Sequence, residues 1–191
     1  MPTVSSQHPS KHRTFPGWQW IAVAVSLPIA GLIAAAVSGP VDAVDAALVG
    51  GALTGAGVGA VQWWAAQGAL GRAAPWIGSS AAGYAAGLAA GAALVGYDTD
   101  LGALALMGLV SGAVLGGAQA FVLARGGRRE LALPWALAMP VLFALGWCAT
   151  SAAGINVQDQ FTVFGAAGAV VFMLLSGLVL ARFTPARPQA A

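Results

Sequence analysis

Long apolar stretches separated by short polar breaks run along the chain from residue 17 to residue 182. A helix of about 20 residues crosses a hydrocarbon core of about 30 Å, and six of the stretches are long enough to do so. The predicted spans are 17–38, 44–68, 74–96, 101–125, 133–153 and 160–182. Strands of a membrane barrel alternate apolar and polar residues, which these stretches do not. The pattern therefore predicts an all-α integral membrane protein with six transmembrane helices.

The predicted transmembrane domain covers residues 17–183 and leaves two tails, 1–16 and 184–191, on the same side of the membrane. The first tail is polar and interrupted by proline, which is typical of a disordered segment. His8 and His12 in this tail have the spacing of metal ligands on a helix, but Pro9 stands between them. We therefore predict no metal site.

Composition agrees with a membrane environment, because hydrophobic residues make up 59% of the chain and charged residues only 7%. So few charges do not cover a water-soluble globule. With six spans, one side of the membrane receives every basic residue and the other side receives the aspartates. The basic residues are Lys11, Arg13, Arg72, Arg125, Arg128, Arg129, Arg182 and Arg187, and the aspartates are Asp42, Asp45, Asp98, Asp100 and Asp159. The positive-inside rule then predicts that both termini are cytoplasmic.

Six tryptophans fall near the helix ends on the basic side, where an interfacial aromatic belt is expected. They are Trp18, Trp20, Trp63, Trp64, Trp76 and Trp135.

A repeated motif occurs in the second and fourth spans. The stretch GALTGAGVGAVQ at 51–62 lies over GLVSGAVLGGAQ at 108–119 at an offset of 57 residues. A second shift of 57 residues reaches Gly165 and Ser176, where serine replaces the amide. Trp20, Trp76 and Trp135 are each followed eleven residues later by a glycine. We therefore expect three helical hairpins, approximately 17–68, 74–125 and 133–182, which point the same way across the membrane.

Glycines at every fourth position form a stripe of small residues on one face of a helix. Lipid gives apolar helices no hydrophobic reason to associate, so close backbone approach at small residues supplies the packing. The glycine stripes therefore predict helix packing of the glycine-zipper kind. The predicted packing positions are Gly51, Gly55, Gly59, Gly83, Gly87, Gly91, Gly108, Gly112, Gly116 and Gly165.

A small set of polar side chains lies within the spans and allows two interpretations. The set is Gln62, Gln119, Ser176, Thr54, Ser111 and Tyr84. Its members either form interhelical hydrogen bonds, worth roughly 0.6 to 2 kcal/mol each, or line a cavity for a solute. We favour hydrogen bonding, because the set is small enough to be used up in packing.

Sequence motifs for catalysis are lacking. The middles of the spans carry no acidic, basic or histidine side chain, and no nucleophile set, metal cluster or phosphate-binding loop occurs. We predict no enzymatic activity, no cofactor and no nucleic-acid partner. The expected partners are the lipid bilayer and other membrane subunits or further copies of the chain.

Two functions remain. The favoured one is an accessory or scaffold subunit, or a self-associating helix bundle. The alternative is a binding or permeation protein, such as a transporter component, for a small neutral or apolar solute. A cavity of at least about 300 Å³ bounded by the polar set would favour the alternative. A close-packed centre with a small-residue stripe facing lipid would favour the first function.

The pattern GxxxGxxxGxxQW at 51–63, with its basic turn and the tryptophan-led helix that follows, resembles uncharacterised multi-pass proteins of bacterial genomes. The resemblance covers Trp20 to Arg182, with Ala120 in place of the tryptophan in the second repeat and no glutamine in the third. It implies a multi-pass protein of the bacterial cytoplasmic (inner) membrane. It implies no activity.

Overall fold

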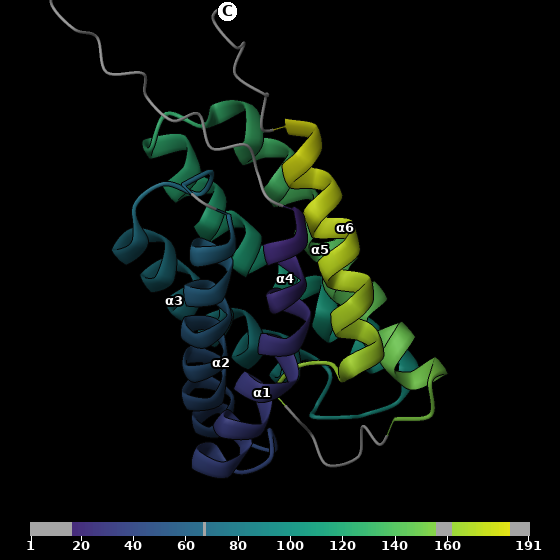
Figure 1. Ribbon diagram of the computed structural model, residues 1–191. Coiled ribbons are helices and arrows are strands. Elements are labelled where there is room, and N and C mark those ends of the chain that lie inside the picture. The colour runs from purple at the N-terminus through teal and green to yellow at the C-terminus, as the bar shows by residue number, and fades with distance from the viewer. Residues whose placement is uncertain (1–16, 67, 156–161, 184–191) are drawn as a thin grey trace, which may run out of the picture.

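The computed structural model describes residues 17–66, 68–155 and 162–183, and the described chain is all-helical (Figure 1). The elements are the 3-10 turn η1 (Gly17–Trp20) and the helices α1 (Ile21–Ser38), α2 (Val44–Ala65), α3 (Ala73–Leu94), α4 (Leu101–Arg125), α5 (Arg129–Ala152) and α6 (Ala166–Phe183). All six helices, α1 together with its leading turn, are long and apolar enough to cross a membrane. The architecture is that of a multi-pass helical membrane protein.

The six helices close into a ring. Within the described chain, each helix makes its close backbone contacts with its neighbours in the sequence, and α6 returns to contact α1. Both termini of the described chain lie at the same end of the bundle (Figure 1). A ring of this kind has one central region that all six helices face, and the candidate site lies there.

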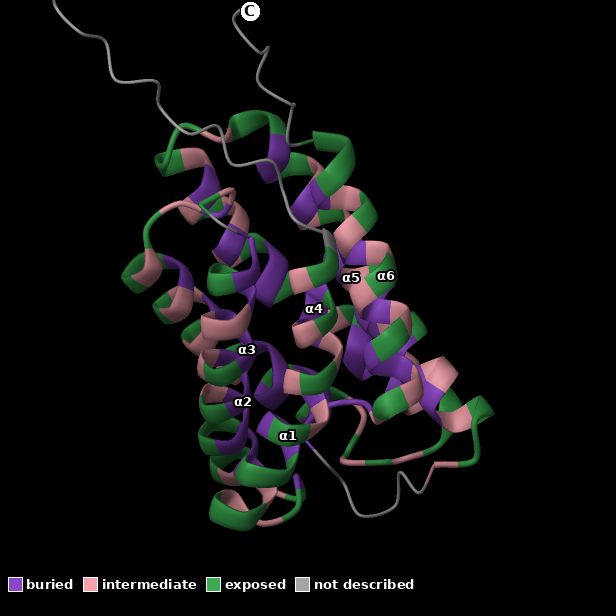
Figure 2. Ribbon diagram, viewed as in Figure 1, coloured by how far each residue is buried: buried purple, intermediate pink, exposed green. Residues whose placement is uncertain are grey.

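Each helix has a buried face and an exposed face (Figure 2), and the exposed faces include many bulky apolar residues. Ile21, Val25 and Ile29 of α1 are exposed, whereas Thr54 and Gln62 of α2 are buried. An apolar exterior around a polar-containing centre is the arrangement that a lipid solvent favours.

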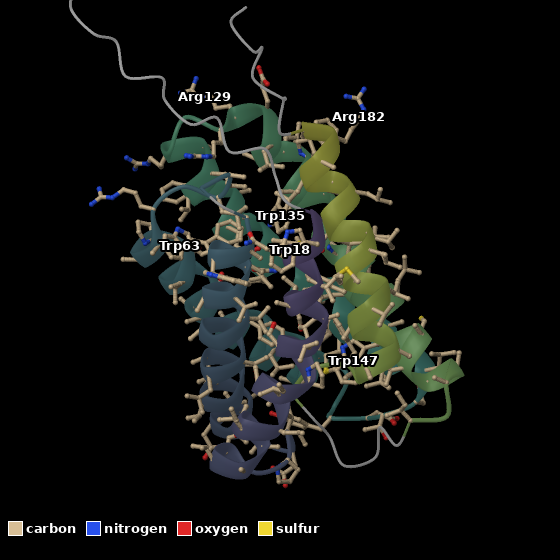
Figure 3. All side chains as sticks on the ribbon, viewed as in Figure 1. Trp18, Trp63, Arg129, Trp135, Trp147 and Arg182 are labelled. Atoms are coloured by element: carbon tan, nitrogen blue, oxygen red, sulfur yellow. The ribbon has the colours of Figure 1, made fainter. Side chains whose placement is uncertain are left out.

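Charged side chains gather at the two ends of the bundle. Figure 3 shows Arg129 and Arg182 at the end where the described chain begins and stops. Arg128 at this end donates hydrogen bonds from Nη2 to the carbonyl of Gly68 (2.8 Å) and from Nη1 to that of Gly126 (3.1 Å). This side chain therefore joins the turn after α2 to the turn after α4. The described aspartates flank helix ends on the opposite side, and Lys11, Arg13, Arg187 and Asp159 lie outside the described residues.

Two helix boundaries differ from the sequence prediction by several residues. α5 starts at Arg129 and not at residue 133, and Glu130 lies in its first turn, where an acidic side chain stabilises the positive end of the helix dipole. α6 starts at Ala166 and not at residue 160. The described residues before α6, Thr162 to Phe164, are buried in the centre of the ring. Hydrogen bonds to the side chain and backbone of Thr162, described below, hold this segment outside the helix.

Candidate functional site

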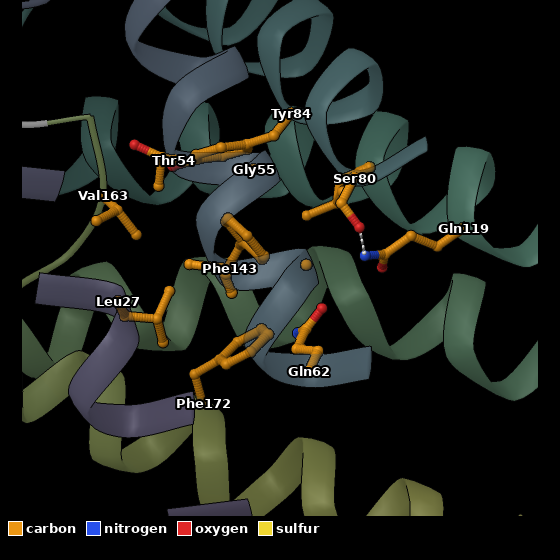
Figure 4. Close-up of a pocket in the computed structure, with 13 residues that line it drawn as sticks. Leu27, Thr54, Gly55, Gln62, Ser80, Tyr84, Gln119, Phe143, Val163 and Phe172 are labelled. Carbon is orange, nitrogen blue, oxygen red and sulfur yellow. Dashed lines mark hydrogen bonds between the residues drawn. The ribbon is translucent and has the colours of Figure 1, made fainter. Parts of the chain in front are cut away.

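A central cavity lies inside the ring, and residues from all six helices line it (Figure 4). The space that the centre of a water molecule can occupy in it is about 20 Å³. Its polar lining comes from α2, α3 and α4, and its apolar lining includes Leu27, Phe143 and Phe172. The polar residues among its lining carry only neutral amides and hydroxyls, and most of the cavity surface is apolar.

Gln119 is the centre of a hydrogen-bond chain across three helices. Its Nε2 donates to Ser80 Oγ of α3 at 2.8 Å, and its Oε1 accepts from Trp135 Nε1 of α5 at 2.8 Å. The Ser80 hydroxyl in turn donates to the backbone carbonyl of Trp76 at 2.8 Å. Both ends of the Gln119 amide are therefore bonded within the protein (Figure 4).

A second tryptophan makes a similar bond between α6 and the start of the chain. Trp20 Nε1 donates to Ser176 Oγ at 3.1 Å, and the Ser176 hydroxyl donates to the carbonyl of Phe172 at 2.6 Å. The third tryptophan, Trp76, is fully buried, and its Nε1 has no partner among the described residues.

Gln62 differs from Gln119, because its side-chain amide has no hydrogen-bond partner among the described residues. The residue is only 2% exposed, and it lines the central cavity. In Figure 4 the dashed line joins Ser80 and Gln119, and none reaches Gln62. Gln62 is thus a buried residue that faces the central cavity.

The segment before α6 closes the cavity on another side. Thr162 and Thr54 share a hydrogen bond between their hydroxyls at 2.8 Å, and the Tyr84 hydroxyl donates to the Thr162 carbonyl. Next to this group, Phe143 packs against Tyr84 (ring centroids 5.4 Å apart) and Phe172 (5.5 Å). These aromatic side chains fill most of the centre of the ring.

The glycine stripes lie at helix–helix contacts. A Cβ on Gly51 would lie 2.8 Å from Ala85 Cα, and one on Gly55 or Gly59 would meet Ser80. Two further stripes are similarly crowded. Those of α3 (Gly83, Gly87 and Gly91) lie against α4, and those of α4 (Gly108, Gly112 and Gly116) lie against α5. Gly165 is different, because it lies one residue before α6 and is not part of a helix–helix contact stripe. A Cβ on Gly165 would meet the side chains of Ile155 and Thr150.

The predicted polar set is only partly gathered in one place. Gln62, Gln119, Thr54 and Tyr84 line the cavity. Ser111 instead donates to the carbonyl of Gly87 at 3.1 Å across the α3–α4 contact. Ser176 bonds Trp20 and Phe172 away from the cavity, as described above. Only the first four remain candidate site residues.

Sequence reasoning missed Ser80 and Thr162. A signal existed for Ser80, since it lies four residues after Trp76 and four before Tyr84, on one face of α3. Thr162 carried no such signal, because the apolar pattern placed it inside a helix.

Of the six tryptophans predicted to form an interfacial belt at the basic end, three are exposed and three are buried, and the prediction is wrong for the buried ones. Trp18 is 70% exposed, and Trp63 and Trp64 are exposed as well. The other three, Trp20, Trp76 and Trp135, are at most 1% exposed. For Trp20 and Trp135 the physical reason is a hydrogen bond from the indole N–H to a neighbouring helix, and Trp76 packs edge-on against Trp135 with ring centroids 5.8 Å apart.

Comparison with known protein families, curated proteins and solved structures finds no match for this chain. Among the described residues, no group of three or more His, Cys, Asp or Glu side chains is placed to hold a metal ion.

A second feature lies on the outside of the ring. Along α3, the residues that face outward at every fourth position are all small, and we call them the α3 outer face: Ala74, Gly78, Ala82, Ala86 and Ala90. A Cβ added to Gly78 would have no neighbour within 4 Å. Leu94 is the only exposed large hydrophobic residue of α3. The other five helices expose several bulky side chains each, so α3 alone presents a smooth surface.

Proposed function

We propose that this protein is a non-enzymatic multi-pass membrane protein with an accessory or scaffold role, and that it associates with a second copy of itself through the α3 outer face. The observation that carries the proposal is the contrast between this face and those of the other helices. In lipid, small residues at every fourth position let two backbones approach closely, and van der Waals contact then accumulates.

Other stripes of the same spacing in this chain are already covered. The glycines of α2 pack on α3, those of α3 pack on α4, and those of α4 pack on α5. The α3 outer face has the same chemistry but lacks a covering helix. A second copy is the simplest occupant, because two identical faces related by a two-fold axis form a self-complementary contact.

Bulky substitutions on this face test the proposal. We expect Ala82→Leu to reduce self-association in lipid bilayers at least about tenfold, which corresponds to about 1.4 kcal/mol, because the added isobutyl group separates the two backbones. The measurement is Förster transfer between donor-labelled and acceptor-labelled protein in vesicles at varied protein-to-lipid ratios.

Ala113→Leu is the matched control, since Ala113 is also exposed but lies on α4, among larger side chains. Energy transfer that is equally strong in the unmodified protein and in both variants would contradict an association through α3. A protein that remains monomeric at every protein-to-lipid ratio would contradict self-association altogether.

We further propose that the basic end of the bundle faces the cytoplasm of a bacterium, in the inner membrane. The positive-inside rule supports this orientation, because the described arginines lie at the end where the described chain begins and stops. In a Cys148→Ser background, we expect Asp98→Cys to react with a membrane-impermeant maleimide on intact cells. Phe183→Cys should react only after lysis, and the reverse labelling pattern would refute the orientation.

The three-hairpin repeat remains part of the proposal, and two sets of contacts support it. Gln119 of α4 bonds Trp135 of α5, and Ser176 of α6 bonds Trp20 at the start of the chain, at matching repeat positions. Gly87 also approaches Ser111 as Gly146 approaches Gly168. The third loop breaks the symmetry, because Thr162 inserts beside Thr54.

Solute passage is the less supported function. The central cavity of about 20 Å³ is far smaller than the roughly 300 Å³ of an ordinary small-molecule site. Aromatic side chains fill the centre around it. The small cavity and the α3 outer face therefore favour the scaffold role over a transporter component.

A further inference from the structure

Three arginines gather around one point at the basic end of the bundle. The Arg128 guanidinium lies between the turn after α2 and the turn after α4, which it joins by hydrogen bonds. A Cβ added to Gly71 would lie 3.1 Å from Arg128 Nη1, and one added to Gly126 would lie 3.2 Å from the same atom. Arg72 directly follows the first of these glycines, and Arg125 directly precedes the second. We call Arg72, Arg125 and Arg128 the arginine cluster.

The positive charge of the arginine cluster is not balanced within the described chain. Arg72 and Arg125 are exposed, and no described carboxylate pairs with any member of the cluster. Arg128 uses two of its N–H donors on backbone carbonyls, and a guanidinium carries more donors than these. Carbonyl dipoles at the ends of α2 and α4 offset part of the charge, but like charges gathered at one point still repel each other. An anion bound at this point would therefore be stabilised.

Exposed aromatic rings lie beside the arginine cluster. The Arg125 guanidinium lies over the ring of Phe121, 5.0 Å from its centroid. Phe121 is 61% exposed and lies one helical turn before Arg125, toward the middle of the bilayer. On α2, Trp63 is exposed, and its indole N–H donates to the Gly71 carbonyl at 2.9 Å. Arginine beside exposed aromatic side chains at a helix end is typical of the membrane interface, where lipid phosphates lie.

We propose that the arginine cluster is a binding site for the phosphodiester of an anionic phospholipid, whose acyl chains lie along Phe121. Guanidinium groups bind phosphate oxygens through paired hydrogen bonds, and Arg128 is held in place for this by its bonds to the two turns. A zwitterionic lipid offers the same phosphate but carries its own cation, which the cluster repels. The site therefore takes lipids of net negative charge in preference to phosphatidylcholine.

Arg182 at the same end of the bundle provides an internal comparison. Its guanidinium lies over the ring of Phe183, 5.7 Å from the centroid, much as Arg125 lies over Phe121. Arg182 belongs to α6, however, and neither of the turns that Arg128 bonds adjoins that helix. A general attraction of positive charge to anionic lipid gives these two arginines equal roles, whereas a site at the cluster gives a role to Arg125 alone. The site lies within one bundle and does not depend on the association proposed for α3.

Lipid binding at the cluster can be measured by native mass spectrometry of the full-length, delipidated protein released from detergent. The measured quantity is the dissociation constant of the first lipid bound. We expect phosphatidylglycerol to bind at least about fivefold more tightly than phosphatidylcholine. Arg72→Gln and Arg125→Gln should each weaken the binding of phosphatidylglycerol about fivefold, the size expected for one basic residue near anionic lipid. Arg182→Gln is the matched control and should leave this dissociation constant unchanged.

Equal dissociation constants for the two lipids in the unmodified protein would overturn the proposal. Equal losses in Arg125→Gln and Arg182→Gln would overturn it as well, since the total charge of this end would then attract the lipid.

A free phosphate ion is the other source of the same chemistry, and ³¹P NMR of inorganic phosphate separates the two. In phosphatidylcholine nanodiscs, we expect the signal of added inorganic phosphate to be equally sharp with the unmodified protein and with Arg72→Gln. Broadening of this signal by the unmodified protein alone would assign the cluster to a free ion and would overturn lipid binding.

Discussion

Replacement of Gly112 by alanine is expected to lower the free energy of unfolding by about 3 kcal/mol, the upper end of the usual range for overpacking. The added methyl group would collide with the carbonyl oxygen of Met139 and would lie 2.8 Å from Pro140 Cα. Both atoms belong to the backbone of α5, so no side-chain rotation relieves the contact. The two helices must separate along much of their length, and leucine at this position is expected to prevent folding.

Gly117 provides the matched control, five residues further along the same helix. It is exposed, and a Cβ there would have no neighbour within 4 Å. Gly117→Ala should be neutral or stabilising by up to about 1 kcal/mol, since alanine is the better helix former. Reversible unfolding by sodium dodecyl sulfate in mixed micelles measures both changes. Equal stability of the two variants would show that close approach of α4 and α5 is not what holds the ring together.

This contrast explains how much of the fold the sequence predicts. The apolar stretches specify six helices, because a membrane needs about 20 apolar residues per crossing and the polar breaks are short. The glycine spacing specifies which face of α2, α3 and α4 meets a neighbour. Neither pattern reveals that α6 returns to α1, since ring closure depends on distant contacts such as Trp20 with Ser176.

The candidate site is less predictable than the fold. Gln62 and Gln119 occupy matching positions in the repeat, yet one is fully bonded and the other faces a cavity. The difference arises from Ser80, whose hydroxyl has no counterpart in α1, and from Trp135, whose indole N–H bonds Gln119 whereas that of Trp76 has no partner among the described residues. Single residues on neighbouring helices decide such details, and a pattern of spacing along one helix does not contain them.

The buried tryptophans show the same limit. Tryptophan near a helix end is typical of the membrane interface, and that rule holds for Trp18, which is exposed. Trp135 lies at a similar depth but turns inward, because Gln119 offers an acceptor for its N–H. For Trp135 the hydrogen-bonding partner, and not the distance from the helix end, explains why the indole points inward.

That bond leads to the second large effect. Gln119→Met is expected to cost about 1–3 kcal/mol of stability, because the indole N–H of Trp135 loses its acceptor in a site without bulk water. The Ser80 hydroxyl keeps its bond to the Trp76 carbonyl, so the cost falls mainly on Trp135. Gln62→Met is the matched control at the equivalent repeat position. It breaks no bond between protein groups and should cost less than about 1 kcal/mol.

A double-mutant cycle with Trp135→Phe separates the hydrogen bond from the packing of the ring. If the bond carries the effect, Gln119→Met should cost less in the Trp135→Phe background, and the coupling should fall within the roughly 0.5–3 kcal/mol found for residues in contact. Strict additivity of the two changes would contradict this explanation. Equal costs at positions 62 and 119 would contradict it too, since the two glutamines would then be equivalent in energy despite their different partners.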